Sequence, residues 1–186
     1  ATPCPAAAVR HVERYLEQPF RDGCRSELLP QLPYWIQAVM GGLDRGAMLF
    51  ADYGYTRREF YQPDRDDGTL RAYFRHRVHN DPYLWPGLQD ITASVDFTAL
   101  AEAGTQAGFD MAGYTTQANF LLGNGLQERL AEAEARADET TLLRLRNEAK
   151  RLTLPSEMGE RFQVMGFSRD VEFGVAFLFN DLSWRL

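Results

Sequence analysis

Asp52, Tyr53 and Gly54 are the residues best placed to carry chemistry, because they directly follow an unbroken apolar run at positions 47–51. A short continuous run of this kind is typical of a strand buried in a parallel sheet. In open α/β sheets, ligands bind outside the carboxyl ends of such strands. There a carboxylate can orient a substrate or accept a proton, and a tyrosine offers a ring and a hydroxyl. We therefore predict Asp52 and Tyr53 as catalytic residues and Gly54 and Tyr55 as substrate contacts. In the alternative interpretation, Asp52 only caps backbone amides.

Two histidines, His76 and His79, lie in the long segment 55–95. Their HxxH spacing resembles a pair of metal ligands, but no cysteine partner and no HExxH context accompanies them. We expect both histidines to anchor the loop or to contact the substrate, and we predict no metal site. Long segments of this kind are functional or disordered, and the many aromatic residues here favour an ordered one.

Asp90, Thr92 and Asp96 form a third polar group at the end of the same segment. Asp90 and Thr92 alternate with apolar residues, so that in an extended chain the three would share one face. If they converge near Asp52, they make an acidic pocket that suits a guanidinium group. We predict all three as substrate-binding residues. Asp96 is equally well placed to cap the helix that follows it.

Several elements must position these residues, and hydrophobic periodicity, capping residues and glycines indicate where they lie. We predict a sequence of helix, strand, long loop, helix, strand, helices, strand and strand. The elements are a helix over 6–15, a helix that Ser26 caps and Gly41 ends, the strand 47–51, a helix from Asp96 to Gly108, a strand over 109–122, helices that begin at Asn124 and Asp138, and strands over 162–167 and 171–179.

This order predicts an α/β fold, specifically the carboxy-terminal half of a doubly wound sheet that closes on antiparallel strands. A strand preceded by a helix is the second half of a βαβ unit, and the first strand of that unit would lie upstream of residue 1. Its absence would leave one sheet edge exposed. We expect residues 1–25 to be an irregular or helical lead-in from a missing upstream half. Residues 26–186 are expected to form the carboxy-terminal half of the domain.

Composition excludes some classes of partner. The formal net charge of -6 argues against nonspecific binding to nucleic acid, which needs a basic face. No apolar run approaches the length of a membrane helix, so we expect no membrane partner. The sequence also contains no GxSxG, P-loop or GxGxxG motif.

Taken in order, several short motifs together resemble the carboxy-terminal half of the MidA-like family of bacterial and mitochondrial S-adenosylmethionine-dependent methyltransferases. The resemblance covers most of residues 26–186. The motifs that carry it are Asp52-Tyr53-Gly54, Gly68-Thr69-Leu70-Arg71, His76 and His79, Pro86-Gly87, Asp90-Ile91-Thr92, Val95-Asp96-Phe97, Met158-Gly159-Glu160-Arg161-Phe162 and Phe179-Asn180-Asp181-Leu182-Ser183-Trp184.

The resemblance implies a partial Rossmann-like, class I methyltransferase fold, with S-adenosylmethionine as cofactor in the intact protein. It also implies that the family's glycine-rich loop and most other cofactor contacts lie upstream, so no cofactor-binding residue is assigned here. Mitochondrial members act in respiratory complex I assembly as protein-arginine methyltransferases. The expected reaction is therefore methyl transfer to an arginine of a protein substrate, by a cytoplasmic bacterial enzyme whose partner is its own upstream half.

Two other functions fit the same residues. A non-catalytic assembly domain would use the acidic segment 55–95 to dock a partner protein on a Rossmann-like scaffold, because fold does not fix function. A metal hydrolase would use His76 and His79 as ligands and would contain a bound metal.

Overall fold

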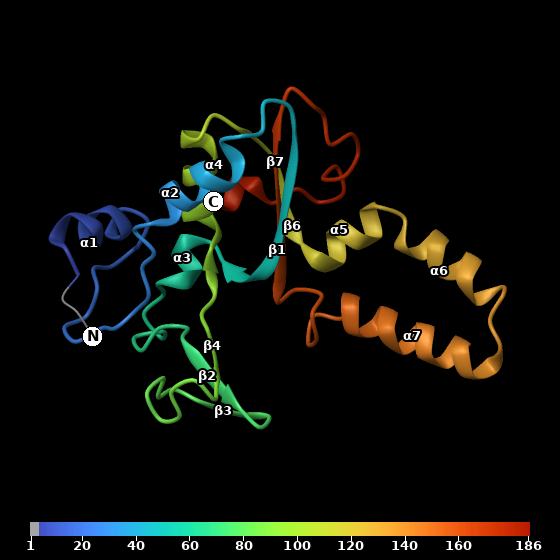
Figure 1. Ribbon diagram of the computed structural model, residues 1–186, viewed down its shortest axis with the longest axis horizontal. Coiled ribbons are helices and arrows are strands. Elements are labelled where there is room, and N and C mark those ends of the chain that lie inside the picture. Colours follow the sequence, from blue (N-terminus) through green and yellow to red (C-terminus); the bar gives the residue numbers. More distant parts are fainter. Residues whose placement is uncertain (1–3) are drawn as a thin grey trace.

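The computed structural model describes residues 4–186, and its centre is a four-stranded mixed sheet (Figure 1). The strands lie in the order β5 (Val95–Asp96), β1 (Gly46–Tyr55), β7 (Phe162–Arg169) and β6 (Asp110–Thr116). The pairs β1–β7 and β6–β7 are antiparallel, whereas β1 and β5 are parallel. The predicted α/β sheet that closes on antiparallel strands is confirmed.

Two helices, α2 (Leu32–Met40) and α4 (Phe97–Gln106), supply most of the apolar residues that pack with the sheet. The capping signals predicted for α4 are correct, because Asp96 accepts a hydrogen bond from the Ala99 amide at 2.9 Å. Gly108 follows the helix with a φ of +81°. The core contains Ile36, Met40, Phe97, Leu100, Ala103, Phe109, Tyr114, Met165 and Phe167.

Strand β1 differs from the prediction, because it is not buried on both faces. Residues 46–51 alternate between half-buried and exposed, residues 51–53 are all exposed, and Leu49 is 47% and Tyr53 48% exposed. One edge pairs with β7 along its length, but the other pairs with β5 only at Gly54 and Tyr55. Among residues 4–186, no strand covers that second edge from Gly46 to Tyr53. The open edge is the one expected for a sheet whose preceding strand lies elsewhere.

The segment expected to be a long ordered loop contains a short helix and a second, smaller sheet. Helix α3 (Arg57–Phe60) follows β1 directly. Strands β2 (Arg71–Phe74), β3 (Arg77–His79) and β4 (Asp90–Thr92) form an antiparallel sheet in the order β3-β2-β4. This unit, which we call the small lobe (residues 66–94), projects from one end of the main sheet (Figure 1). Strands of three or four residues leave too short a pattern for sequence periodicity to detect.

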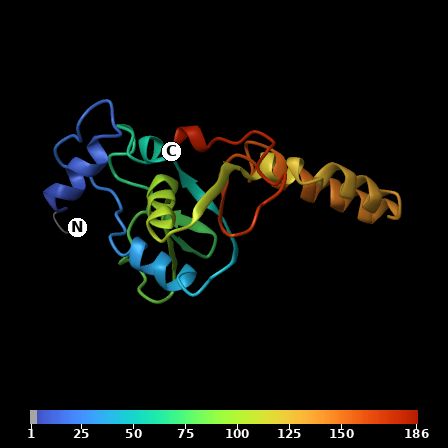
Figure 2. The same ribbon diagram turned by 90° about the horizontal axis from the view of Figure 1, so that it is seen from above.

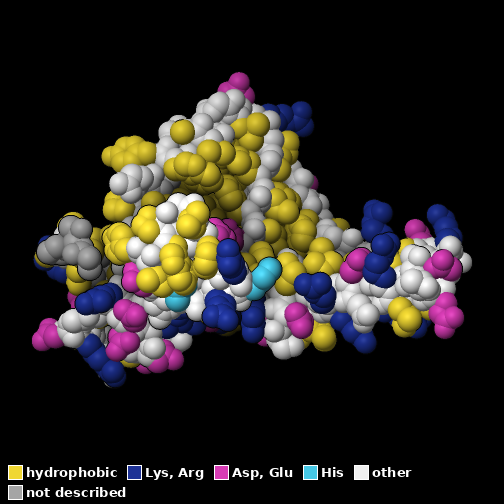
Figure 3. Space-filling model, turned by 60° about the horizontal axis from the view of Figure 1, so that its bottom comes forward, with side chains coloured by type: hydrophobic (Ala, Val, Ile, Leu, Met, Phe, Trp, Pro, Cys, Tyr) yellow, Lys and Arg dark blue, Asp and Glu magenta, His cyan; other side chains and the backbone are white. Residues whose placement is uncertain are grey.

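Three helices form an arm that extends away from the sheet (Figures 1 and 2). They are α5 (Gln117–Gly123), α6 (Leu126–Glu134) and α7 (Glu139–Thr153). Neither α6 nor α7 has a fully buried residue, and charged side chains cover the arm at the right of Figure 3, whereas hydrophobic ones gather in the upper part of that face. Helix α1 (Ala6–Glu13) and the final 3-10 turn (Ser183–Arg185) complete the elements. No helix within residues 4–186 is long and apolar enough to cross a membrane.

The main errors of the prediction are three element boundaries and one whole strand. The second helix begins at Leu32 rather than after Ser26, since Pro30 lies before the helix and Pro33 is tolerated only in its first turn. The strand over 109–122 ends at Thr116, whose hydroxyl caps α5. Helix α6 begins after Gly125, not after Asn124.

The fourth error is the predicted strand over 171–179, which is a run of turns. Its alternating apolar residues suggested a strand, but Phe177 instead packs over Gly113 of β6 and Gly166 of β7. The apolar residues of this segment therefore cover the sheet with aromatic side chains and do not form a further strand of it.

Gly104 provides a test of the packing between α4 and the sheet. A Cβ at this position would overlap the ring of Phe167, which is fully buried. Overpacking a dense core costs about 1–3 kcal/mol, more than the roughly 1 kcal/mol that alanine gains over glycine in a helix. We expect Gly104→Ala to lower the free energy of unfolding of the intact protein in urea by about 1–2 kcal/mol. Gly42→Ala is the control, because no atom lies within 4 Å of a Cβ there. A Gly104→Ala variant as stable as the wild type would contradict this packing.

Candidate active site

Asp52 and Tyr53 lie at the end of β1 where the second edge of the strand is open. Asp52 is exposed, and its Oδ1 accepts a hydrogen bond from the Tyr53 amide at 2.7 Å. The Tyr53 ring packs against Phe162 at a tilt of 42° with 3.9 Å between centroids, yet the residue remains 48% exposed. The local backbone contact of Asp52 is the one its alternative interpretation predicted. It leaves the second carboxylate oxygen free for a ligand or a neighbouring segment.

Gly54 and Tyr55, predicted as substrate contacts, make contacts that belong to the fold. A Cβ on Gly54 would overlap both the Phe97 ring and the Val95 carbonyl oxygen, so the glycine allows β5 and α4 to approach β1. The Tyr55 ring lies beneath the guanidinium of Arg65, 3.7 Å from its centroid. Packing therefore explains Gly54 without a ligand.

The small lobe divides its four predicted site residues between different surfaces. In β4, Asp90 pairs with Tyr73 and Thr92 pairs with Arg71, so these side chains share one face of the small sheet. His79 pairs with Ala72 and therefore points to the other face.

The histidines occupy different environments within the lobe. His76 sits in the turn between β2 and β3 with a φ of +63°, and it is exposed. His79 packs edge-on against Trp85, and both of its ring nitrogens are buried without a hydrogen-bond partner. Among residues 4–186, no group of three or more His, Cys, Asp or Glu is arranged to hold a metal ion.

Asp96 makes contacts that belong to the fold, including the helix cap that was its alternative interpretation. One carboxylate oxygen caps α4 and the other accepts a hydrogen bond from Arg57 Nε at 3.0 Å. Of the residues predicted to converge in one acidic pocket, Asp96 thus has both carboxylate oxygens occupied within the fold. Asp52 belongs to the main sheet, and Asp90 and Thr92 to the small one.

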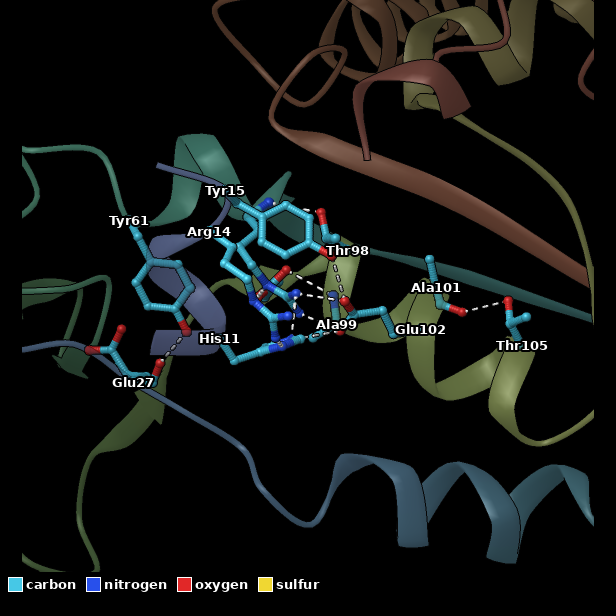
Figure 4. Close-up of polar contacts among 12 residues, drawn as sticks. His11, Arg14, Tyr15, Glu27, Tyr61, Thr98, Ala99, Ala101, Glu102 and Thr105 are labelled. Carbon is cyan, nitrogen blue, oxygen red and sulfur yellow. Dashed lines mark hydrogen bonds and ion pairs between the residues drawn. The ribbon is translucent and has the colours of Figure 1, made fainter. Parts of the chain in front are cut away.

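Sequence reasoning missed a cluster of polar side chains around Arg57, which is only 3% exposed. Its members His11, Tyr15 and Glu102 are labelled in Figure 4. Besides Asp96, the guanidinium binds Glu102 through two hydrogen bonds of 2.8 Å and contacts His11 Nε2 at 3.0 Å. The Tyr15 hydroxyl donates to Glu102 at 2.8 Å. These residues come from three separate segments, 11–15, 57 and 96–102, so no local pattern could have identified the cluster.

The charges in this cluster are strongly coupled. Burial acts to raise the pKa of Glu102, but hydrogen bonds from Arg57 and Tyr15 and the positive charge of Arg57 lower it to about 2. Burial also opposes the charged form of Arg57, yet Glu102 and Asp96 raise its pKa above the usual value. Because every strong donor and acceptor in the cluster is satisfied, we assign it the task of fastening α1 and α4 to α3 rather than a reaction.

Two cavities lie near this end of β1. One, of about 550 Å³, opens beside Thr56, the residue after β1, and is also lined by Arg58, Glu59 and Trp184. Another, of about 330 Å³, lies between α1 and the segment 20–28. The first lies at the carboxyl end of the strand, where ligands of open α/β sheets bind. No residue of β1 lines the second.

A family model described as "Putative S-adenosyl-L-methionine-dependent methyltransferase" matches residues 2–115. The chain belongs to this family. Within the match lie β1, the small lobe and α4, and hence all the predicted site residues, whereas the helical arm and β7 lie outside it.

Solved structures and curated proteins agree with this membership. A likely methyl transferase from Burkholderia thailandensis, bound to S-adenosyl-homocysteine, is 37% identical with a TM-score of 0.86 and covers all of this chain. The protein arginine methyltransferase NDUFAF7 of Danio rerio is 35% identical over 121 residues, 64% of this chain, and the human protein 32% identical over 121 residues. The chain spans 47% of the bacterial structure and about a quarter of each curated relative, 26% and 25% respectively.

The Arg57 cluster predicts how stability depends on pH. A carboxyl group whose pKa falls from 4.5 in the unfolded chain to about 2 in the folded one adds stability above pH 4.5. That stability is lost as the pH falls from 4.5 towards 2. We expect Glu102→Gln to lower the melting temperature at pH 7 and to flatten its decline across this range, measured by circular dichroism. Glu128→Gln, on the exposed face of α6, is the control. A Glu102→Gln variant with the wild-type pH profile would contradict the coupling.

Proposed function

We propose that the intact protein to which this chain belongs transfers a methyl group from S-adenosylmethionine to an arginine side chain of a protein. The family membership supports methyl transfer, and the S-adenosyl-homocysteine in a relative 37% identical over the whole chain supports the cofactor. The names of the NDUFAF7 relatives support arginine as the acceptor. The single observation that carries the assignment of roles is the exposed Asp52 at the open end of β1.

The surface around the open edge supports a position for the rest of the protein. Tyr34 is 79% exposed, Trp35 50% and Val39 44%, and all three lie on α2. Leu49 of β1 is also 47% exposed. An open strand edge beside exposed apolar side chains is a surface that an added strand and its covering helix would bury. We place the cofactor-binding half of the protein there, because this chain has no glycine-rich loop of its own.

When bound, the cofactor supplies an electrophilic methyl group, and the role of this chain is to present the acceptor. Asp52 orients the guanidinium through paired hydrogen bonds and receives the proton that the acceptor nitrogen loses. The exposed ring of Tyr53 packs against the planar guanidinium. Orientation of this kind supplies much of the rate enhancement of a displacement reaction.

The face of the small sheet that carries Asp90 and Thr92 binds the polypeptide around the acceptor. Its neighbour Tyr73 is 44% exposed, so an aromatic ring and a carboxylate lie side by side on this surface. An aromatic ring next to an acidic group favours basic segments. His76, exposed in the turn of the same lobe, is a further contact for the polypeptide.

A second candidate, a non-catalytic assembly domain, is favoured by the apolar residues that the small lobe exposes. Tyr83 is 81% exposed, Leu88 70% and Val78 58%. On that reading, the lobe docks a partner protein and no methyl group is transferred. The glycine-rich loop of the full-length sequence separates the two functions, since an intact loop favours the enzyme and a degraded one favours the scaffold.

Replacing Asp52 tests the proposed reaction. In the intact protein, we expect Asp52→Ala to lower methyl incorporation into arginine by at least about 100-fold, because orientation and proton acceptance are both lost. Incorporation is measured by mass spectrometry with an undermethylated lysate, from cells that lack the gene, as acceptor. The melting temperature should not change, because Asp52 is exposed. Asp110→Ala, at the start of β6, is the control, and wild-type turnover by Asp52→Ala would refute the role of Asp52.

Cofactor binding tests where the cofactor site lies. We expect isothermal titration calorimetry to detect clear binding of S-adenosylmethionine to the intact protein, and weak or no binding to residues 1–186 alone. The reason is that backbone amides of a glycine-rich loop make the main contacts in such sites, and this chain has none. Tight binding to the chain alone would place the cofactor contacts within these 186 residues and contradict the proposal.

A further inference from the structure

We propose that Glu27 is a positioning residue, which fixes the small lobe at the carboxyl end of β1 by holding Thr69. The lobe leaves the main domain near residue 66 and returns to it at Ser94. The importance of its orientation for catalysis rests on the proposed methyl transfer. Neither Glu27 nor Thr69 is among the residues to which a site role was assigned from the sequence.

The Glu27 carboxylate binds the start of the lobe through three hydrogen bonds. Its Oε2 accepts from the Thr69 amide at 2.9 Å and from the Thr69 hydroxyl at 3.0 Å. Its Oε1 accepts from the Leu70 amide at 3.0 Å. Hydrogen bonds to an ionised carboxylate are stronger than those between neutral groups. Leu70 directly precedes β2, so the carboxylate holds the lobe at the point where its first strand begins.

The backbone on both sides of Glu27 adds to this attachment. The Arg25 amide donates to the Asp66 carbonyl at 2.7 Å, and Arg25 forms a β-bridge with Asp67. The Tyr61 hydroxyl donates to the Glu27 carbonyl oxygen at 3.0 Å (Figure 4). The carboxylate therefore projects from a segment that is itself held in place.

Gly68 allows the close approach of the lobe to Glu27. It has a φ of +69°, which side chains other than glycine rarely adopt, and a Cβ there would overlap the Glu27 carboxylate. The turn before Thr69 is thus shaped to bring two successive amides onto one carboxylate.

Thr69 also joins the two ends of the lobe. Its hydroxyl donates to Glu27 and accepts a hydrogen bond from the Ser94 amide at 3.0 Å. The next residue, Val95, pairs with Gly54 at the end of β1. One hydroxyl therefore connects the entry of the lobe, its exit and the strand end that carries Asp52. A tilt of the lobe would break these bonds together. It would also displace Asp90 and Thr92, which the lobe carries.

Removal of the Thr69 hydroxyl tests, in the intact protein, whether its hydrogen bonds position the small lobe. Thr69→Val keeps the shape of the side chain but loses both hydroxyl contacts, whereas Thr69→Ser keeps them. We expect Thr69→Val to lower kcat/KM for an undermethylated lysate by about 10- to 100-fold, as for a misplaced substrate contact. The affinity for S-adenosylmethionine should stay within about twofold, because Thr69 lies outside the proposed cofactor half. Thr69→Ser should restore wild-type transfer.

Hydrogen exchange provides a readout that does not depend on activity. We expect Thr69→Val to increase exchange at the Ser94 amide, and Glu27→Gln to increase it at the amides of Thr69 and Leu70. Glu128→Gln on the helical arm is the control and should change neither. Unchanged protection in both variants would overturn the positioning role.

The two readouts also separate failure of this proposal from failure of the proposed function. If the wild type transfers no methyl group to arginine, the proposed function is wrong, and hydrogen exchange alone decides whether Glu27 holds the lobe. If Thr69→Val loses cofactor affinity in parallel with transfer, or if Thr69→Ser fails to rescue it, the effect is a general loss of structure and the positioning role is refuted.

Discussion

The rest of the structure depends on a short parallel contact, in which Gly54 and Tyr55 of β1 pair with Val95 and Asp96 of β5. This contact returns the chain to the main sheet after the excursion through α3 and the small lobe. It also sets the start of α4, since Asp96 both ends β5 and caps that helix. A side chain at position 54 would overlap Phe97, so the contact requires glycine. The strand end, the lobe and the helix therefore share one fixed point.

Polar residues near this point divide into two groups that serve different purposes. Arg57 is buried and Glu102 half-buried, and they bind each other as well as Asp96 and Tyr15. Removing Glu102 would leave the buried charge of Arg57 partly uncompensated. Their perturbed pKa values consequently reflect the fold. Asp52 is exposed and makes one local backbone contact, so its charge remains free to interact. The shifted pKa values belong to the Arg57 cluster, whereas the proposed role of Asp52 rests on its position on the sheet.

Local signals in the sequence predicted what depends on neighbouring residues. Asp96 and Gly108 mark the ends of α4 correctly because a cap and a left-handed glycine act within one helical turn. The sequence could not reveal the Arg57 cluster, because Arg57 contacts residues 39 to 46 positions away. The prediction that β1 is buried on both faces was also wrong for these residues. An apolar run indicates that a strand is covered in the complete protein, but it does not indicate which segment covers it. The split of His79 from Asp90 across the small sheet follows from pairing that no spacing of single residues reveals.

The open edge of β1 links the two halves of the proposed enzyme. Backbone amides and carbonyls along this edge need partners, and a strand added there would order the segment that ends in Asp52 and Tyr53. The part of the protein that binds the cofactor would then also complete the placement of the residues that present the acceptor. On the other side of the same strand end, Glu27 and Thr69 hold the lobe that carries Asp90 and Thr92. On the proposed function, the geometry of the acceptor would be set from two directions, by completion of the sheet and by attachment of the lobe, and either alone would leave half of the site free to move.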